Sequence, residues 1–123
     1  ELLKYIYKVR EPYNVSAVAA AGAEAALQDK DFICESLETV LNERDAVCRF
    51  LSENNITYIP SYGNFLLIPL GERSAAVRRA LADNGIIVRL LSFRGTKMLR
   101  VSVWLPYENR AFEKSLLKAI KTA

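Results

Sequence analysis

The stretch MLRVSVWLP (residues 98–106) alternates apolar and polar side chains from Leu99 to Val103, as a β-strand with one buried face does. One face carries Leu99, Val101 and Val103, and the other carries Arg100, Ser102 and Trp104. An unpaired guanidinium is very costly to bury, so Arg100 needs a partner. That partner is either an acidic side chain of this protein or an anionic ligand.

The segments around this strand give an α+β order of elements. Further strands are predicted at residues 56–60, 64–70 and 86–91, with a loop at 92–97 before the strand at 98–104. Helices are predicted at residues 15–28, 29–54, 74–85 and 106–120. We therefore expect N-terminal helices followed by β-β-α-β-β-α, with a four-stranded sheet packed on helices.

Length and composition fit one ordinary globular domain. The chain has 123 residues, of which 51% are hydrophobic and 25% charged, so disorder is not expected. The net charge of +3 is weak evidence for nucleic acid, and no aromatic-rich basic motif accompanies it. The longest apolar run, residues 15–23, is too short to span a bilayer. We expect neither nucleic acid nor membrane as a partner.

Several kinds of catalytic centre are excluded by the residue types present. The chain has no histidine, so it can form neither a Ser–His nor a Cys–His pair, and no glycine-rich phosphate loop appears. Cys34 and Cys48 lie fourteen residues apart in one predicted helix, about 21 Å along its axis, and cannot bridge each other there. We expect no metal site and free thiols that suit the cytoplasm. The pattern is typical of a binding lobe with no catalytic residue of its own.

Two arginines form the candidate binding site. Arg89 ends the apolar stretch GIIVR of the strand predicted at 86–91, and Arg100 follows eleven residues later in the next strand. Two adjacent strands would bring both guanidinium groups to one region of the sheet, where their planar forks suit carboxylate or phosphate. The alternative is that both arginines pair with Glu or Asp elsewhere in the fold.

Four stretches, in order, resemble the C-terminal part of histidinol-phosphate aminotransferase, a fold-type I enzyme that uses pyridoxal phosphate. They are KVREPYNVSAVAAAGAEAALQD, NERDAVCRFLSENNITYIPSYGNFLLIPL, DNGIIVRLL and MLRVSVWLPYENRAF. The resemblance implies a small, C-terminal substrate-binding domain at residues 29–123. Residues 1–28 would be connecting helices from a large domain that carries the Schiff-base lysine. It also implies a cytoplasmic homodimer.

The resemblance also implies roles for individual residues. Arg100 would bind the α-carboxylate of glutamate or 2-oxoglutarate. Arg89 would contact the phosphate of histidinol phosphate or imidazole-acetol phosphate. Tyr13 and Asn14 match a turn that approaches the active site near the dimer interface. Asn64 matches a family position as well, although a cap at the start of a strand is an alternative reading of it.

Other functions stay open at this point. Trp104 stands where the family commonly has glycine after the strand, which leaves a related aromatic amino-acid aminotransferase possible. The FRG sequence before the strand is similar to phosphothreonine decarboxylases. A third alternative, without any enzymatic activity, is a stand-alone module that binds small anions through the same arginines.

Overall fold

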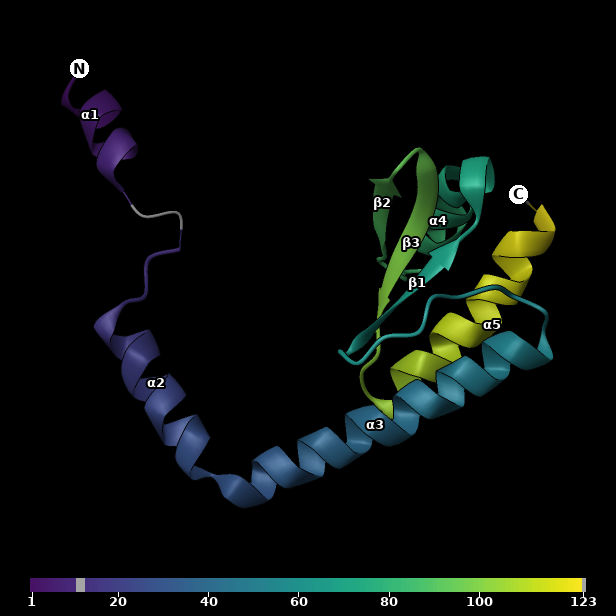
Figure 1. The fold of residues 1–123 in the computed structure, drawn as a ribbon, viewed down its shortest axis with the longest axis horizontal. Helices are drawn as coiled ribbons and strands as arrows, with labels where there is room; N and C mark the ends of the chain where they lie inside the picture. Colours follow the sequence, from purple (N-terminus) through teal and green to yellow (C-terminus); the bar gives the residue numbers. More distant parts are fainter. Residues whose placement is uncertain (11–12, 123) are drawn as a thin grey trace. The chain divides into compact units, whose positions relative to one another are not determined.

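The computed structural model describes residues 1–10 and 13–122, which fall into two units, Glu1–Glu35 and Ser36–Ala123 (Figure 1). The first unit contains α1 (Leu2–Val9), α2 (Ala17–Gln28) and the beginning of α3 (Lys30–Glu53). Neither α1 nor α2 buries a residue within the described part of this chain. The hydroxyl oxygen of Ser16 accepts a hydrogen bond from the Ala19 N–H at 3.2 Å and caps α2, which begins two residues after the predicted start at residue 15 and ends at Gln28 as predicted.

The second unit is an antiparallel sheet with helices packed against it. The strands β1 (Phe65–Pro69), β2 (Arg89–Phe93) and β3 (Thr96–Ser102) lie in the order β1-β3-β2. The helices are the later part of α3, α4 (Ser74–Asp83) and α5 (Pro106–Thr122), and a short 3-10 turn, η1 (Gly71–Arg73), precedes α4. The predicted α+β class is confirmed.

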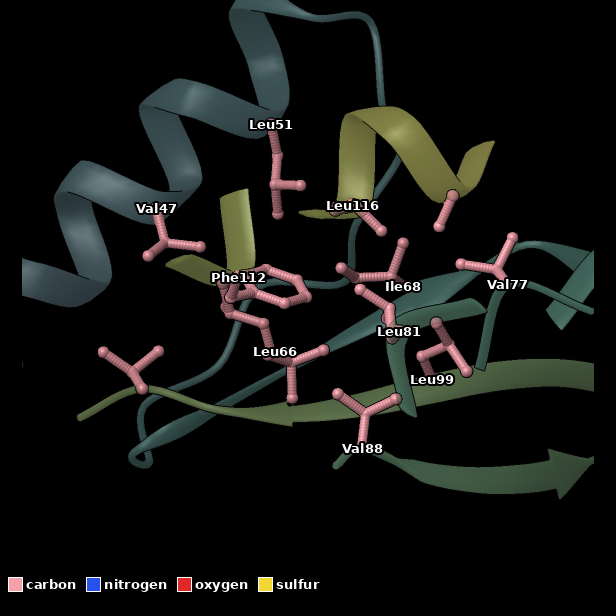
Figure 2. Close-up of a cluster of buried hydrophobic side chains, with 13 residues drawn as sticks. Val47, Leu51, Leu66, Ile68, Val77, Leu81, Val88, Leu99, Phe112 and Leu116 are labelled. Atoms are coloured by element: carbon pink, nitrogen blue, oxygen red, sulfur yellow. The ribbon is translucent and has the colours of Figure 1, made fainter. Parts of the chain in front are cut away.

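The hydrophobic core of this unit joins one face of the sheet to the three helices. Leu99, Val101 and Val103 are all buried, as the alternation around Arg100 predicts. Figure 2 shows side chains from the strands meeting those from α3 and α5. The fully buried members of this core include Leu51, Leu66, Ile68, Val77, Leu81, Leu99 and Leu116. Burial of each of these side chains stabilises the folded state by about 1.5–3 kcal/mol. This packing fixes the position of β3 and therefore of the Arg100 backbone.

The prediction of four strands is wrong, because residues 56–60 form only a single bridge, between Ile59 and Leu67. The Ile56 N–H donates to the Leu51 carbonyl at 2.9 Å and closes the end of α3, where Asn55 has a φ of 56°. Pro60 has no N–H to donate. Two of the five residues therefore cannot donate to a sheet, and the segment packs on the core as an extended loop.

The predicted loop at residues 92–97 is also wrong. Ser92 and Phe93 belong to β2, and β3 begins at Thr96, so only Arg94 and Gly95 connect the two strands. Their φ angles are 49° and 81°, the pattern of a two-residue turn whose twist matches that of the flanking strands. The predicted strand at 86–91 correspondingly begins later, at Arg89.

No helix within residues 1–10 and 13–122 has both the length and the apolar character needed to cross a membrane.

Candidate anion-binding site

Arg89 and Arg100 are direct partners in the β2–β3 ladder. The next pair, Leu90 and Leu99, faces the core, so alternation puts both arginines on the opposite face of the sheet. Arg89 is exposed and Arg100 half-buried. Like charges placed directly opposite each other destabilise a sheet. Within the described part of the chain, no carboxylate forms an ion pair with either one.

The guanidinium of Arg100 is held in place by an aromatic ring. Its central carbon lies 4.3 Å from the centroid of the Phe65 ring, on the neighbouring strand β1. A cation over a ring at this distance is attracted to its face by about 0.5–1 kcal/mol at a partly exposed site. The contact restrains the guanidinium while consuming none of its N–H donors, which remain free for a ligand.

A hollow of about 410 Å³ opens where the β2–β3 ladder ends at the arginine pair. We call it the arginine hollow, and its lining residues are Arg78, Ile87, Val88, Arg89, Leu90, Arg100 and Ser102. It therefore brings together both predicted arginines and a third one, Arg78 from α4, which no sequence pattern indicated. Arg78 could be placed there only by knowing how α4 docks on the sheet.

A second hollow of about 440 Å³ shares Ile87, Val88 and Ser102 with the arginine hollow. It is lined by residues 85–88 and by residues from the end of β3 to the start of α5, among them the aromatic side chains Trp104 and Tyr107. Trp104 is 54% exposed, so its ring is available for contact. An aromatic surface thus adjoins the arginine hollow.

A buried polar network ties α3 to α5 beside the end of β3. The Asn109 side-chain N–H groups donate to Glu43 Oε2 at 2.8 Å and to the Trp104 carbonyl at 3.1 Å. The Asn109 side-chain oxygen accepts a hydrogen bond from the Trp104 N–H at 3.2 Å. Arg110 contacts Glu43 at 3.5 Å and Glu113 at 3.0 Å. Burial raises the pKa of Glu113; Arg110 opposes the rise and Glu43 adds to it. This network, which we call the α3–α5 network, has no signature in the sequence because Glu43 and Asn109 are 66 positions apart.

The remaining predicted site residues, Tyr13, Asn14 and Asn64, are not among those that line the arginine hollow. Tyr13 and Asn14 are exposed in the first unit, whereas the arginine pair belongs to the second. Asn64 is exposed just before β1, and its backbone carbonyl accepts a hydrogen bond from the Val103 N–H at 2.8 Å. That bond extends the β1–β3 pairing by one step. An active-site role for these three residues stays a prediction.

In the part of the chain that the structure describes, the thiols and acidic residues do not gather into a metal site. The described ranges, 1–10 and 13–122, contain no group of three His, Cys, Asp or Glu side chains placed to hold an ion. Cys34 is exposed rather than buried. Burial raises the pKa of the half-buried Cys48, which keeps it a neutral thiol.

Comparison with known proteins identifies the family. The family described as "Aminotransferase class I and II" matches residues 1–111. This chain belongs to that family. Histidinol-phosphate aminotransferase 2 of Hydrogenovibrio crunogenus is 34% identical over 125 residues, which cover 100% of this chain and 34% of that protein. Its counterpart in Nitrosospira multiformis is 41% identical over 118 residues, covering 94% and 30%.

Solved structures of aminotransferases share the fold. The crystal structure of histidinol-phosphate aminotransferase from Sinorhizobium meliloti in complex with pyridoxal-5'-phosphate matches with a TM-score of 0.78 at 24% identity. The match covers 97% of this chain and 34% of that one. The chain thus has the fold of part of an aminotransferase and spans about a third of the length of the curated relatives it matches.

Proposed function

We propose that this chain is the small, C-terminal domain of a pyridoxal-phosphate-dependent aminotransferase, namely histidinol-phosphate:2-oxoglutarate aminotransferase of histidine biosynthesis. Residues 29–123 form the substrate-binding domain, and residues 1–28 are the connecting helices that lead from a large domain. The identity of 34–41% with histidinol-phosphate aminotransferases supports this proposal.

The observation that carries the proposal is the arginine pair. Two like charges, Arg89 opposite Arg100, carry no acidic partner among the described residues and share one hollow. An anionic substrate would relieve their repulsion. Arg100 grips the carboxylate of glutamate or 2-oxoglutarate, and Arg89 contacts the phosphate of histidinol phosphate or imidazole-acetol phosphate.

Pyridoxal phosphate supplies the electron sink for the substrate carbanion when it is bound. The residues of this chain fit a place beside the cofactor rather than the role of holding it. The lining of the arginine hollow includes no lysine from the described part of the chain, and Lys97 on β3 is ion-paired with Glu72 at 2.6 Å. This domain binds and orients the substrate anion and, by closing, excludes water. The family resemblance supports a cytoplasmic homodimer.

Steady-state kinetics of the complete enzyme test the proposal. Arg100→Ala should raise the KM for glutamate by orders of magnitude, because losing a bidentate charged contact costs about 2–5 kcal/mol. Arg89→Gln should raise the KM for histidinol phosphate. Arg94→Gln, at the far end of the same hairpin, is the matched control and should change neither. Near-normal KM values in both site variants would refute the assignment.

One observation favours a second candidate. The exposed ring of Trp104 lines the hollow next to the arginine hollow, which suits an aromatic amino acid whose carboxylate lies on Arg100. Comparing kcat/KM for phenylalanine and for histidinol phosphate decides between these substrates. Preference for phenylalanine would make the protein an aromatic amino-acid aminotransferase.

A further inference from the structure

We propose that Arg78 of α4 is a further specificity-determining residue, which acts with Arg89 to bind a phosphate monoester. The inference rests on the proposed function and deepens it by assigning a residue that the sequence pattern did not indicate. The observation behind it is that Arg78 lines the same hollow as Arg89 and Arg100, although it comes from a helix rather than from the sheet.

The position of Arg78 is set by the packing of its helix. Val77 and Leu81, the residues before and three after it, are fully buried in the core. The Ser74 hydroxyl at the start of α4 donates to the Lys97 carbonyl of β3 at 3.0 Å, which ties the helix to the central strand. The backbone of Arg78 is therefore fixed relative to β3, and the residue lines the hollow from a rigid base.

The charge in the arginine hollow exceeds what a carboxylate needs. Three guanidinium-bearing residues line it, and within residues 1–10 and 13–122 none of them forms an ion pair with a carboxylate. A carboxylate carries one negative charge and two oxygens. A phosphate monoester carries about two charges near pH 7 and offers three oxygens. With Arg100 assigned to a carboxylate, the two remaining cationic forks, Arg78 and Arg89, match a dianion with three acceptors better than a second monoanion.

The helix also offers a matched control. Arg79 is the next residue of α4, is exposed as Arg78 is, and carries the same charge, but it does not line the arginine hollow. Replacing either arginine removes one positive charge from nearly the same place. A difference between the two variants therefore reports contact with the ligand rather than a general change in electrostatic potential.

The experiment compares Arg78→Gln and Arg79→Gln in the complete enzyme. Arg78→Gln should raise the KM for histidinol phosphate about tenfold or more, as loss of a hydrogen bond to a charged group does. The inhibition constant of inorganic phosphate, used as a competitor, should rise by a similar factor. The KM for glutamate should stay within about twofold of wild type, and Arg79→Gln should leave all three constants unchanged.

The proposal is overturned if Arg78→Gln leaves both phosphate constants unchanged, or if it raises the KM for glutamate by as much. Arg89→Gln and Arg100→Ala separate this failure from failure of the proposed function, because only the latter leaves those two variants normal. If Arg78→Gln does not fold, Arg78→Lys retains the charge without the fork. Arg78→Lys should raise the inhibition constant of inorganic phosphate several-fold. An inhibition constant equal to that of wild type would then refute the role of Arg78 in phosphate binding.

Discussion

The side chains of Glu43 and Asn109 are joined by a buried hydrogen bond of 2.8 Å between Oε2 and the amide nitrogen. Asn109 is 4% exposed, and its amide group also bonds the backbone N–H and carbonyl of Trp104. One side chain thus connects α3, the end of β3 and α5. The residues that follow Arg100 are held in place by this connection.

Replacing Asn109 should therefore destabilise the protein strongly. Asn109→Ala removes the hydrogen bond to Glu43 Oε2, so that only Arg110, 3.5 Å from Oε1, still contacts this carboxylate. It also removes the side-chain partners of the Trp104 backbone, and together these losses should cost about 2–4 kcal/mol of unfolding free energy. Urea unfolding measures the loss. Asn84→Ala is the control, since Asn84 is exposed and its side chain donates to the Ala80 carbonyl of its own helix. Equal losses in the two variants would contradict the role of the α3–α5 network.

Glu113 should make stability depend on pH. Burial raises its pKa above 4.5, so the folded state holds this proton more tightly than the unfolded state. The resulting stabilisation is present below pH 4.5 and is lost as the pH rises through the raised pKa. Glu113→Gln does not titrate, so its unfolding midpoint should rise relative to wild type over that window. Glu108 is exposed on the same helix, so Glu108→Gln should show the same dependence of the unfolding midpoint on pH as wild type. If Glu113→Gln also showed the wild-type dependence, burial of Glu113 would not control stability.

The two-residue turn between β2 and β3 should respond to substitution in opposite directions at its two positions. Gly95 has a φ of 81° and open space where a Cβ would lie, so Gly95→Ala should cost about 1–2 kcal/mol through backbone strain alone. Arg94→Asn should stabilise, because asparagine tolerates the φ of 49° better. Gly22→Ala is the control, because Gly22 lies inside α2 with open space around it, and alanine there should stabilise the helix rather than destabilise it. Thermal unfolding compares the three, and a neutral Gly95→Ala would refute the turn geometry.

Phe65 should assist substrate binding without touching the substrate. Phe65→Leu removes the ring under the Arg100 guanidinium, so the KM for glutamate should rise about two- to fivefold. The matched control is Phe93→Leu, because the Phe93 ring lies 5.4 Å from the Arg94 guanidinium at the other end of the hairpin. Both variants lose one cation–ring contact, and only the first should change KM. Equal KM values would show that Arg100 needs no such support.

What the sequence could predict depended on local pattern. Alternation around Arg100 identified the buried face of β3, and two strands close in sequence were enough to predict that Arg89 and Arg100 approach each other. Residues 56–60 look like a strand by composition, but the Ile56 N–H is used by the end of α3. Composition does not record that competition for a donor.

The remaining features of the site depend on tertiary packing. Arg78 looks like any exposed helical arginine until α4 is docked against the sheet, and nothing in the spacing of Glu43 and Asn109 indicates that they meet. The two-residue turn at Arg94 has no clear sequence signal, because an arginine at positive φ is uncommon. The sequence around it therefore predicts a longer loop.

The strand order β1-β3-β2 has a consequence for how the domain is synthesised. Among the described strands, β3 comes last in the chain and pairs with both others, so β1 lacks its neighbour in the sheet until residue 102 has been made. Because pairing that spans a long stretch of sequence is slow to form, the sheet should assemble late during translation. Arg100 lies on that same strand, so synthesis of one segment supplies both Arg100 and the strand that completes the sheet.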